Sequence, residues 1–121
     1  MVGCPIIHTS EVFYDNVVYP NLKYLILEEC INPTEVGTLP KALIYVTLDR
    51  CYNLRSIEGL SGLPMLEGVR LIGCDNLRSI EGLCGLPRLQ LVSIESCNEL
   101  QVPSSVEERL KQNHVDIEYR D

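Results

Sequence analysis

The sequence predicts an α/β solenoid with a short parallel sheet, irregular or 3-10 segments on the outer side and a helix–strand cap at the C-terminus. Two observations carry this prediction. The segment Leu43–Met65 is followed by a near copy, Leu66–Arg88, and a third copy begins at Leu89. Cysteines recur with the same 23-residue period at Cys51, Cys74 and Cys97. A fixed period of this length is typical of stacked structural units.

The copies share the frame L-x-x-L-x-L-x-x-C-x-x-L, in which Val or Ile replaces Leu at Val46, Val69, Val92 and Ile94. This frame resembles the leucine-rich repeat in its cysteine-containing form. The resemblance implies a sheet on the concave side and a binding role. The segments C-x-N-L-R-S-I and G-L-P-x-L, and the ending VPSSVEERLKQN, look most like the C-terminal repeats of plant nucleotide-binding immune receptors. IEGL also resembles the short repeats of phosphatase-regulating proteins.

One leucine-rich-repeat domain over 1–121 is expected, divided at repeat boundaries. The divisions are 1–21 (a partial, irregular repeat), 22–42, 43–65, 66–88, 89–101 and 102–121 (the cap). MVGCPII at the start aligns with Leu71–Leu77, which places Cys4 in the cysteine slot and Ile7 at the position of Leu77. This alignment favours a fragment of a longer array, because terminal repeats normally carry a polar cap. A degenerate first repeat is the alternative.

Leu22–Cys30 is the first complete strand, and strands recur in each later copy. In the outer segments, apolar residues follow a 3-residue spacing that suits a 3-10 path with one side inward. They are Leu54, Ile57, Leu60 and Leu63, then Leu77, Ile80, Leu83 and Leu86. Asn32, Asn53 and Asn76 share one slot, where their side chains would satisfy backbone groups of the neighbouring turn. Cys84 replaces Ser61 on the outer side and is the expected accessible thiol.

The repeat pattern stops after Gln101, and a cap follows. Ser105 and Glu108 have the spacing of a capping box, which predicts a helix from about Val106 to Gln112. Val115, Ile117 and Tyr119 alternate with charged residues, as expected of a final strand with polar side chains outward. Charges on an edge strand discourage further pairing.

Composition and charge narrow the function. The net charge of −7 disfavours nucleic acid and anionic membranes, and makes a neutral or basic protein surface the better match. No apolar run is long enough to span a bilayer, and the N-terminus lacks the pattern of a signal peptide. The cysteines at Cys30, Cys51, Cys74 and Cys97 are expected to be reduced, inward-facing thiols. Together these features predict a cytoplasmic protein.

The sequence offers no catalytic site. His8 and His114 lie at opposite ends of the chain, the cysteines lack zinc-site spacing, and no phosphate-binding glycine motif is present. We therefore expect no enzyme activity, no cofactor and no metal.

The residues between the leucines of each strand predict a protein-binding face on the concave sheet. In strand order, the predicted binding residues are Tyr24, Ile26, Glu28, Tyr45, Thr47, Asp49, Arg70, Ile72, Leu91 and Glu95. Gly68 and Ser93 complete the pattern. The first column is largely apolar and the third largely acidic, so the face combines aromatic anchors with an acidic border. A solvated face that merely covers the sheet is the plainer alternative.

The leading hypothesis is a non-catalytic protein-interaction module, and the resemblance implies the ligand-sensing end of an intracellular immune receptor. A substrate-recruiting subunit of a ubiquitin ligase is the second hypothesis. A structural fragment that self-associates through its uncapped N-terminal turn, near Val2 and Ile6, is the third.

Overall fold

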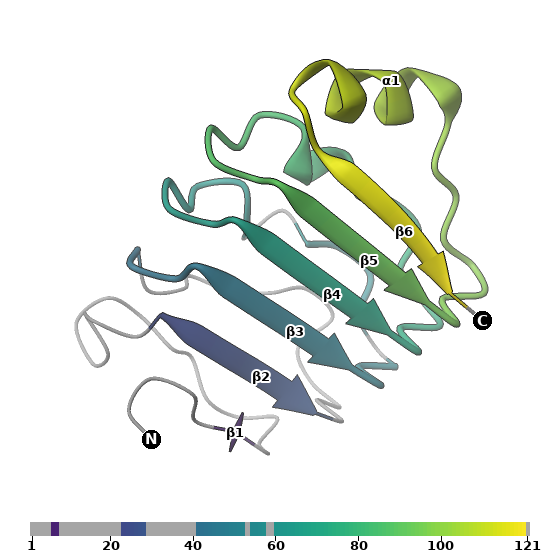
Figure 1. Ribbon diagram of the computed structural model, residues 1–121. Coiled ribbons are helices and arrows are strands. Elements are labelled where there is room, and N and C mark those ends of the chain that lie inside the picture. The colour runs from purple at the N-terminus through teal and green to yellow at the C-terminus, as the bar shows by residue number, and fades with distance from the viewer. Residues whose placement is uncertain (1–5, 8–22, 29–40, 53, 58–59, 121) are drawn as a thin grey trace.

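The computed structural model describes residues 6–7, 23–28, 41–52, 54–57 and 60–120, with backbone only at 6–7. Six parallel strands form one sheet in chain order: β1 (Ile6–Ile7), β2 (Tyr24–Glu28), β3 (Tyr45–Asp49), β4 (Gly68–Ile72), β5 (Leu91–Glu95) and β6 (Asp116–Arg120). The single α-helix in the described residues, α1 (Ser104–Gln112), lies at the β6 end of the sheet (Figure 1). The predicted parallel sheet and C-terminal helix are therefore present.

Strand register follows the sequence period. Tyr45 pairs with Gly68 and Gly68 with Leu91, so equivalent residues of successive copies lie side by side. The shorter spacing before Leu43 does not change the register, because Tyr24 still pairs with Tyr45. Each strand thus repeats the inward and outward pattern of its neighbour.

The N-terminal alignment predicted from MVGCPII is wrong. Ile6 pairs with Ile26 and Ile7 with Leu27, so both occupy strand positions equivalent to Arg70 and Leu71. Their β-branched side chains suit a strand. The predicted alignment had placed Ile7 past the strand, at the position of Leu77. Val2, Cys4 and the rest of 1–5 lie outside the described residues, as does the predicted self-associating turn except for Ile6.

The core lies between the sheet and the returning segments. All eight apolar residues predicted on the outer path are buried: Leu54, Ile57, Leu60, Leu63, Leu77, Ile80, Leu83 and Leu86. They pack with the strand residues that alternate toward the same side, such as Val46 and Leu48. A 3-10 helix, η2 (Glu81–Leu83), confirms the tight path predicted for this segment.

The residue after each of three strands adopts a left-handed conformation. Arg50, Gly73 and Ser96 are 23 residues apart and have φ values of 54°, 60° and 56°. Their amides extend the sheet hydrogen bonding by one step, from Arg50 N to Ile72 O (2.6 Å) and from Gly73 N to Glu95 O (2.8 Å). The turn that ends each strand therefore has one repeated geometry, although only one copy carries glycine there.

The asparagine slot has its predicted structural role at Asn76. The Asn76 Nδ2 donates to the Tyr52 carbonyl at 2.6 Å, in the turn of the preceding copy. Asn98 adds a neighbouring contact, from its Nδ2 to Asp75 Oδ1 at 3.4 Å. Asn32 and Asn53 lie outside the described residues.

Helix α1 begins two residues earlier than predicted, and the predicted capping box is absent. Pro103 is the N-cap residue in an extended conformation (φ −61°, ψ 154°), and no side chain caps the helix. Because the helix starts at Ser104, Ser105 already lies within its first turn and cannot cap it. The extended ψ of Pro103 makes it the last non-helical residue.

Helix α1 packs against the last strand through one face. Val106 and Leu110 are buried, and the Tyr119 hydroxyl donates to Glu107 Oε2 at 2.9 Å. Lys111 Nζ donates to Glu107 Oε1 at 3.2 Å. Glu107 thus joins the helix to β6 through Oε2 and pairs within the helix through Oε1.

Gly73→Ala should destabilise the chain by about 1–2 kcal/mol, because an alanine is strained at positive φ. The added Cβ would also lie 3.3 Å from Arg50 Cγ. Urea unfolding of both proteins measures the difference. The control is Gly85→Ala, whose Cβ would meet nothing within 4 Å and whose φ lies outside the left-handed region. Equal effects of the two substitutions would contradict the conformational explanation.

The Tyr119–Glu107 contact should make stability depend on alkaline pH. Burial and the hydrogen bond to Glu107 raise the pKa of Tyr119 from 10.0 to about 12. A raised folded-state pKa gives stability that is complete below pH 10 and is lost as pH rises toward about 12. Tyr119→Phe should therefore flatten the dependence of unfolding free energy on pH across that window.

Denaturant unfolding at several pH values tests this, with Tyr52→Phe as the control because Tyr52 is an exposed tyrosine elsewhere on the molecule. On the acid side, the hydrogen bonds from Tyr119 and Lys111 lower the pKa of Glu107 below 4.5. The Glu107 contribution should persist above pH 4.5 and disappear as pH falls through the lowered pKa. Parallel curves for wild type and Tyr119→Phe would be inconsistent with the contact.

Candidate protein-binding face

One face of the sheet is not covered by the returning segments that the structure describes, and we call it the open face (Figure 1). It carries alternate residues of β2 to β6 in three rows. The first row is Tyr24, Tyr45, Gly68, Leu91 and Asp116; the middle row is Ile26, Thr47, Arg70, Ser93 and Glu118; the last row is Glu28, Asp49, Ile72, Glu95 and Arg120. All ten predicted binding residues lie here, and each is exposed or half-buried. Their role in binding stays a prediction.

Strand β6 contributes residues that the sequence analysis missed. Asp116, Glu118 and Arg120 are in parallel register with Leu91, Ser93 and Glu95. The alternation after Val115 predicted a capping strand, but α1 interrupts the 23-residue period before it. The alternation itself was the available signal, because a strand that buries Ile117 must turn its neighbours to the other face.

The first row carries a stacked tyrosine pair. The rings of Tyr24 and Tyr45 have centroids 5.8 Å apart and planes inclined by 8°. The Tyr45 ring lies over Gly68, since a Cβ placed on Gly68 would be 2.3 Å from Tyr45 Cε1. Glycine at this position therefore gives the ring its place on the sheet. Tyr45 remains 43% exposed.

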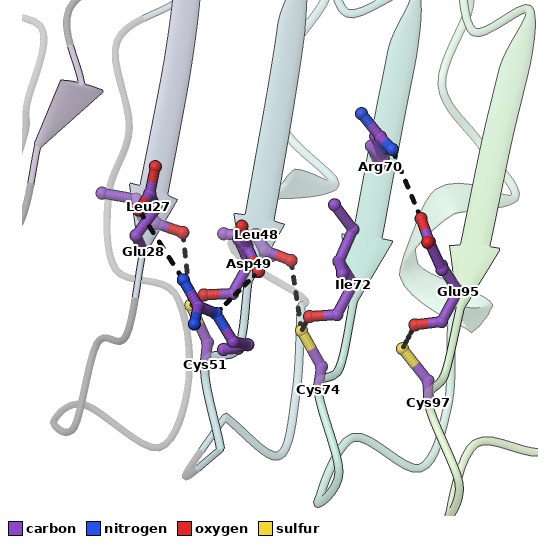
Figure 2. A network of polar contacts seen from close by, with 11 residues as sticks. Leu27, Glu28, Leu48, Asp49, Cys51, Arg70, Ile72, Cys74, Glu95 and Cys97 are labelled. Carbon is purple, nitrogen blue, oxygen red and sulfur yellow. Dashed lines mark hydrogen bonds and ion pairs between the residues drawn. The ribbon is translucent and has the colours of Figure 1, made fainter. Parts of the chain in front are cut away.

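The acidic border of the last row is largely paired with arginines. Arg50 lies 3.2 Å from Asp49 and 4.0 Å from Glu28, and Arg70 lies 3.3 Å from Glu95 (Figure 2). On β6, Arg120 pairs with Glu118 at 3.3 Å. Exposed pairs of this kind stabilise a fold by only about 0–1 kcal/mol. Their consequence is that the face offers mixed charge instead of a continuous acidic edge.

Ser93 lies on the predicted face, in register with Arg70 and Glu118, but it is buried there, at 5% exposure. It lines a depression of about 300 Å³ together with Tyr45, Val46, Thr47, Gly68, Val69, Arg70, Leu91, Glu118 and Arg120. The open face is therefore hollowed over β4 and β5.

The thiols form a row where the strands end, as predicted. Cys51 Sγ donates to the Leu27 carbonyl at 3.6 Å and Cys74 Sγ to the Leu48 carbonyl at 3.4 Å (Figure 2). None of the described cysteines, Cys51, Cys74, Cys84 and Cys97, forms a disulfide. The thiols thus act as weak donors as well as apolar filling. Cys4 and Cys30 lie outside the described residues.

Cys84 is not the accessible thiol that the sequence predicted. It is 5% exposed, although the equivalent Ser61 is exposed. Helix α1 covers this segment, with Asn113 Nδ2 donating to the Cys84 carbonyl at 3.3 Å and Arg109 lying 3.8 Å from Glu81. Burial raises the pKa of the Cys84 thiol.

Cys97 is the half-buried member of the thiol row. A hydrogen bond with the Cys74 thiol lowers the pKa of Cys97 to about 7, and the Glu95 carbonyl lies 3.6 Å from its Sγ. The same row raises the pKa of Cys74, through hydrogen bonds with Cys51 and Cys97 and through burial. Reactivity follows thiolate fraction and exposure, so Cys97 is the most reactive of the four described thiols.

Iodoacetamide near pH 7 should therefore alkylate Cys97 well before Cys84 in the folded chain. Peptide mapping by mass spectrometry at timed quenches measures both rates in one sample. Cys74→Ala removes the hydrogen-bonding thiol and should slow the alkylation of Cys97 several-fold at that pH, while Cys84→Ser should leave its rate unchanged. Faster labelling of Cys84 than of Cys97 would overturn this assignment.

Within the residues that the structure describes, no three His, Cys, Asp or Glu side chains are grouped so that they could hold a metal ion. That part of the chain also holds no helix with the length and apolar character that a bilayer crossing requires. Comparison of the chain with protein-family models, curated proteins and solved structures gives no match.

Proposed function

We propose that this chain is a cysteine-containing leucine-rich repeat, an α/β solenoid whose open face is the concave face and binds a protein partner without catalysis. Support comes from the strand order and the register, which places residues 23 apart side by side. The repeated left-handed residue agrees with it, as do the reduced thiols of Cys51, Cys74 and Cys97, which occupy one position of successive copies. The likeness to plant immune receptors makes ligand sensing in the cytoplasm part of this proposal, and reduced thiols suit that compartment.

The observation that carries the proposal is the tyrosine stack on the open face. Tyr45 is 43% exposed and its ring is held in place between Tyr24 and the backbone of Gly68. An aromatic side chain that is already ordered loses little conformational freedom on binding. Such anchors dominate the energy of protein interfaces.

The mixed charge of the open face refines the expected partner. The overall charge of −7 favours a neutral or basic surface during encounter. At the contact itself, Glu28, Asp49 and Glu95 already pair with arginines, so fewer basic groups are required of the partner there. The proposed partner is therefore a protein segment that contributes apolar and neutral polar groups.

The test is the double variant Tyr24→Ala/Tyr45→Ala. Losing the anchors should weaken partner binding by about tenfold or more, since aromatic anchors are commonly worth 2 kcal/mol or more. The thermal midpoint should fall by only a few degrees, because a ring pair is worth about 0.5–1.5 kcal/mol. Partners are captured from an extract of the source cells, identified by quantitative mass spectrometry and titrated against purified chain.

The matched control is Arg55→Ala/Arg78→Ala, two exposed residues of the outer segments. A protein captured by wild type and control, but lost by the tyrosine variant, uses the open face. Retention by the tyrosine variant with unchanged affinity would remove this face as the binding surface.

A further inference from the structure

A buried hydroxyl that has no partner among the described residues lies at the centre of the open face. Ser93 is 5% exposed, and its Oγ makes no hydrogen bond with any residue that the structure describes. Ser93 lines the depression of about 300 Å³ over β4 and β5. Buried hydroxyls are normally hydrogen-bonded, so an unsatisfied one in a hollow indicates a group that a ligand completes.

The two residues beside Ser93 in the middle row have opposite hydrogen-bonding character. Arg70 on β4 and Glu118 on β6 are its register partners on either side. Neighbouring strands are about 4.8 Å apart, and all three residues line the same depression. The row therefore presents a donor, a hydroxyl and an acceptor in order across the depression.

Ion pairing leaves much of this capacity unused. Arg70 Nη2 lies 3.3 Å from Glu95 Oε2, and Arg120 Nη2 lies 3.3 Å from Glu118 Oε1. A guanidinium has five N–H donors and a carboxylate about four acceptor positions, so each pair leaves others available. The two pairs are also neutral overall, which disfavours a ligand group with a full charge.

Apolar surface lies beside the middle row. Tyr45 and Leu91 line the same depression from the first row, on either side of Gly68. Because Gly68 has no side chain, an aliphatic stem can approach the sheet between them. The depression thus combines an apolar side with a polar row that both donates and accepts.

We propose that this depression binds the carboxamide of an Asn or Gln side chain from the protein partner. The carboxamide oxygen accepts from Arg70, its NH2 group donates to Glu118, and the Ser93 hydroxyl takes the remaining position. The aliphatic stem packs between Tyr45 and Leu91. A carboxylate would face Glu118, and an ammonium would face Arg70, so either charge fits less well. This inference rests on the proposed function and names the chemistry of its central contact.

The test is an NMR titration of the full 121-residue chain with capped tripeptides Ac-Ala-X-Ala-NH2, where X is Gln, Glu, Lys or Met. The four peptides share a backbone, so differences report on the side chain. Gln should give saturable shifts at the amides of Gly68, Ser93 and Glu118. The dissociation constant of the Gln peptide should be about 2- to 10-fold lower than that of the Met peptide, because one or two neutral hydrogen bonds make a difference of that size.

Ser93→Ala should abolish the preference for Gln over Met without lowering the thermal midpoint, because the removed hydroxyl has no partner in the described structure. Ser105→Ala, an exposed serine of α1, is the matched control and should keep the preference. Glu118→Gln should reduce discrimination against the Glu peptide. The inference is overturned by equal binding of Gln and Met, by tighter binding of Glu or Lys, by no saturable shift at these amides, or by an unchanged Gln preference in Ser93→Ala.

The two proposals fail in different ways. Loss of partner capture in the tyrosine variant, together with no Gln preference, would leave the open face as the binding surface and remove the carboxamide. An unaffected tyrosine variant would remove the open face as the partner surface, whereas the peptide titration would still report on the depression directly.

Discussion

The parallel backbone ladder in chain order is the constraint on which this structure depends. Each strand pairs in register with the equivalent residues of the preceding copy, so one sequence period produces one row of each kind of side chain. A single turn cannot form alone, because the entropy of ordering its backbone exceeds what its own core offers. The amides of Arg50, Gly73 and Ser96 continue the same ladder one step past each strand. The register therefore also accounts for the positive φ of these three turn residues.

The same register places like charges side by side on the open face, and arginines lie beside those charges. Identical positions lie about 4.8 Å apart, so acidic residues at one position face each other across neighbouring strands. Glu28 and Asp49 are such a pair, and Arg50 lies close to both. On the next strand the position is occupied by Ile72, and Arg70 reaches Glu95 instead. The resulting face has charges of both signs, many of them paired, beside a largely apolar first row, which suits recognition of neutral polar groups.

The period alone allowed the parallel sheet, its two faces and the buried outer residues to be predicted, because each depends only on the stacking of equivalent residues. The errors fall where the stacking is interrupted. Cys84 and Ser61 are equivalent in sequence, but α1 folds back over the first. Ser93 lies on its predicted face, but the period does not predict that it is buried there. Ile6 and Ile7 fit a strand as well as an outer turn by hydrophobicity, and only pairing with β2 distinguishes the two.

The thiol row shows why cysteine suits its position better than a purely apolar residue of similar size. Cys51 and Cys74 each follow a strand, and their thiols donate to the carbonyls of Leu27 and Leu48 at 3.6 and 3.4 Å. Alanine would leave a void and no donor, and valine would fill the space without donating to the carbonyl. A disulfide between neighbours would remove both S–H donors and twist two strands held in register by the ladder. The reduced state is therefore the one that satisfies the backbone, and the chemistry of this row follows from the geometry of the sheet.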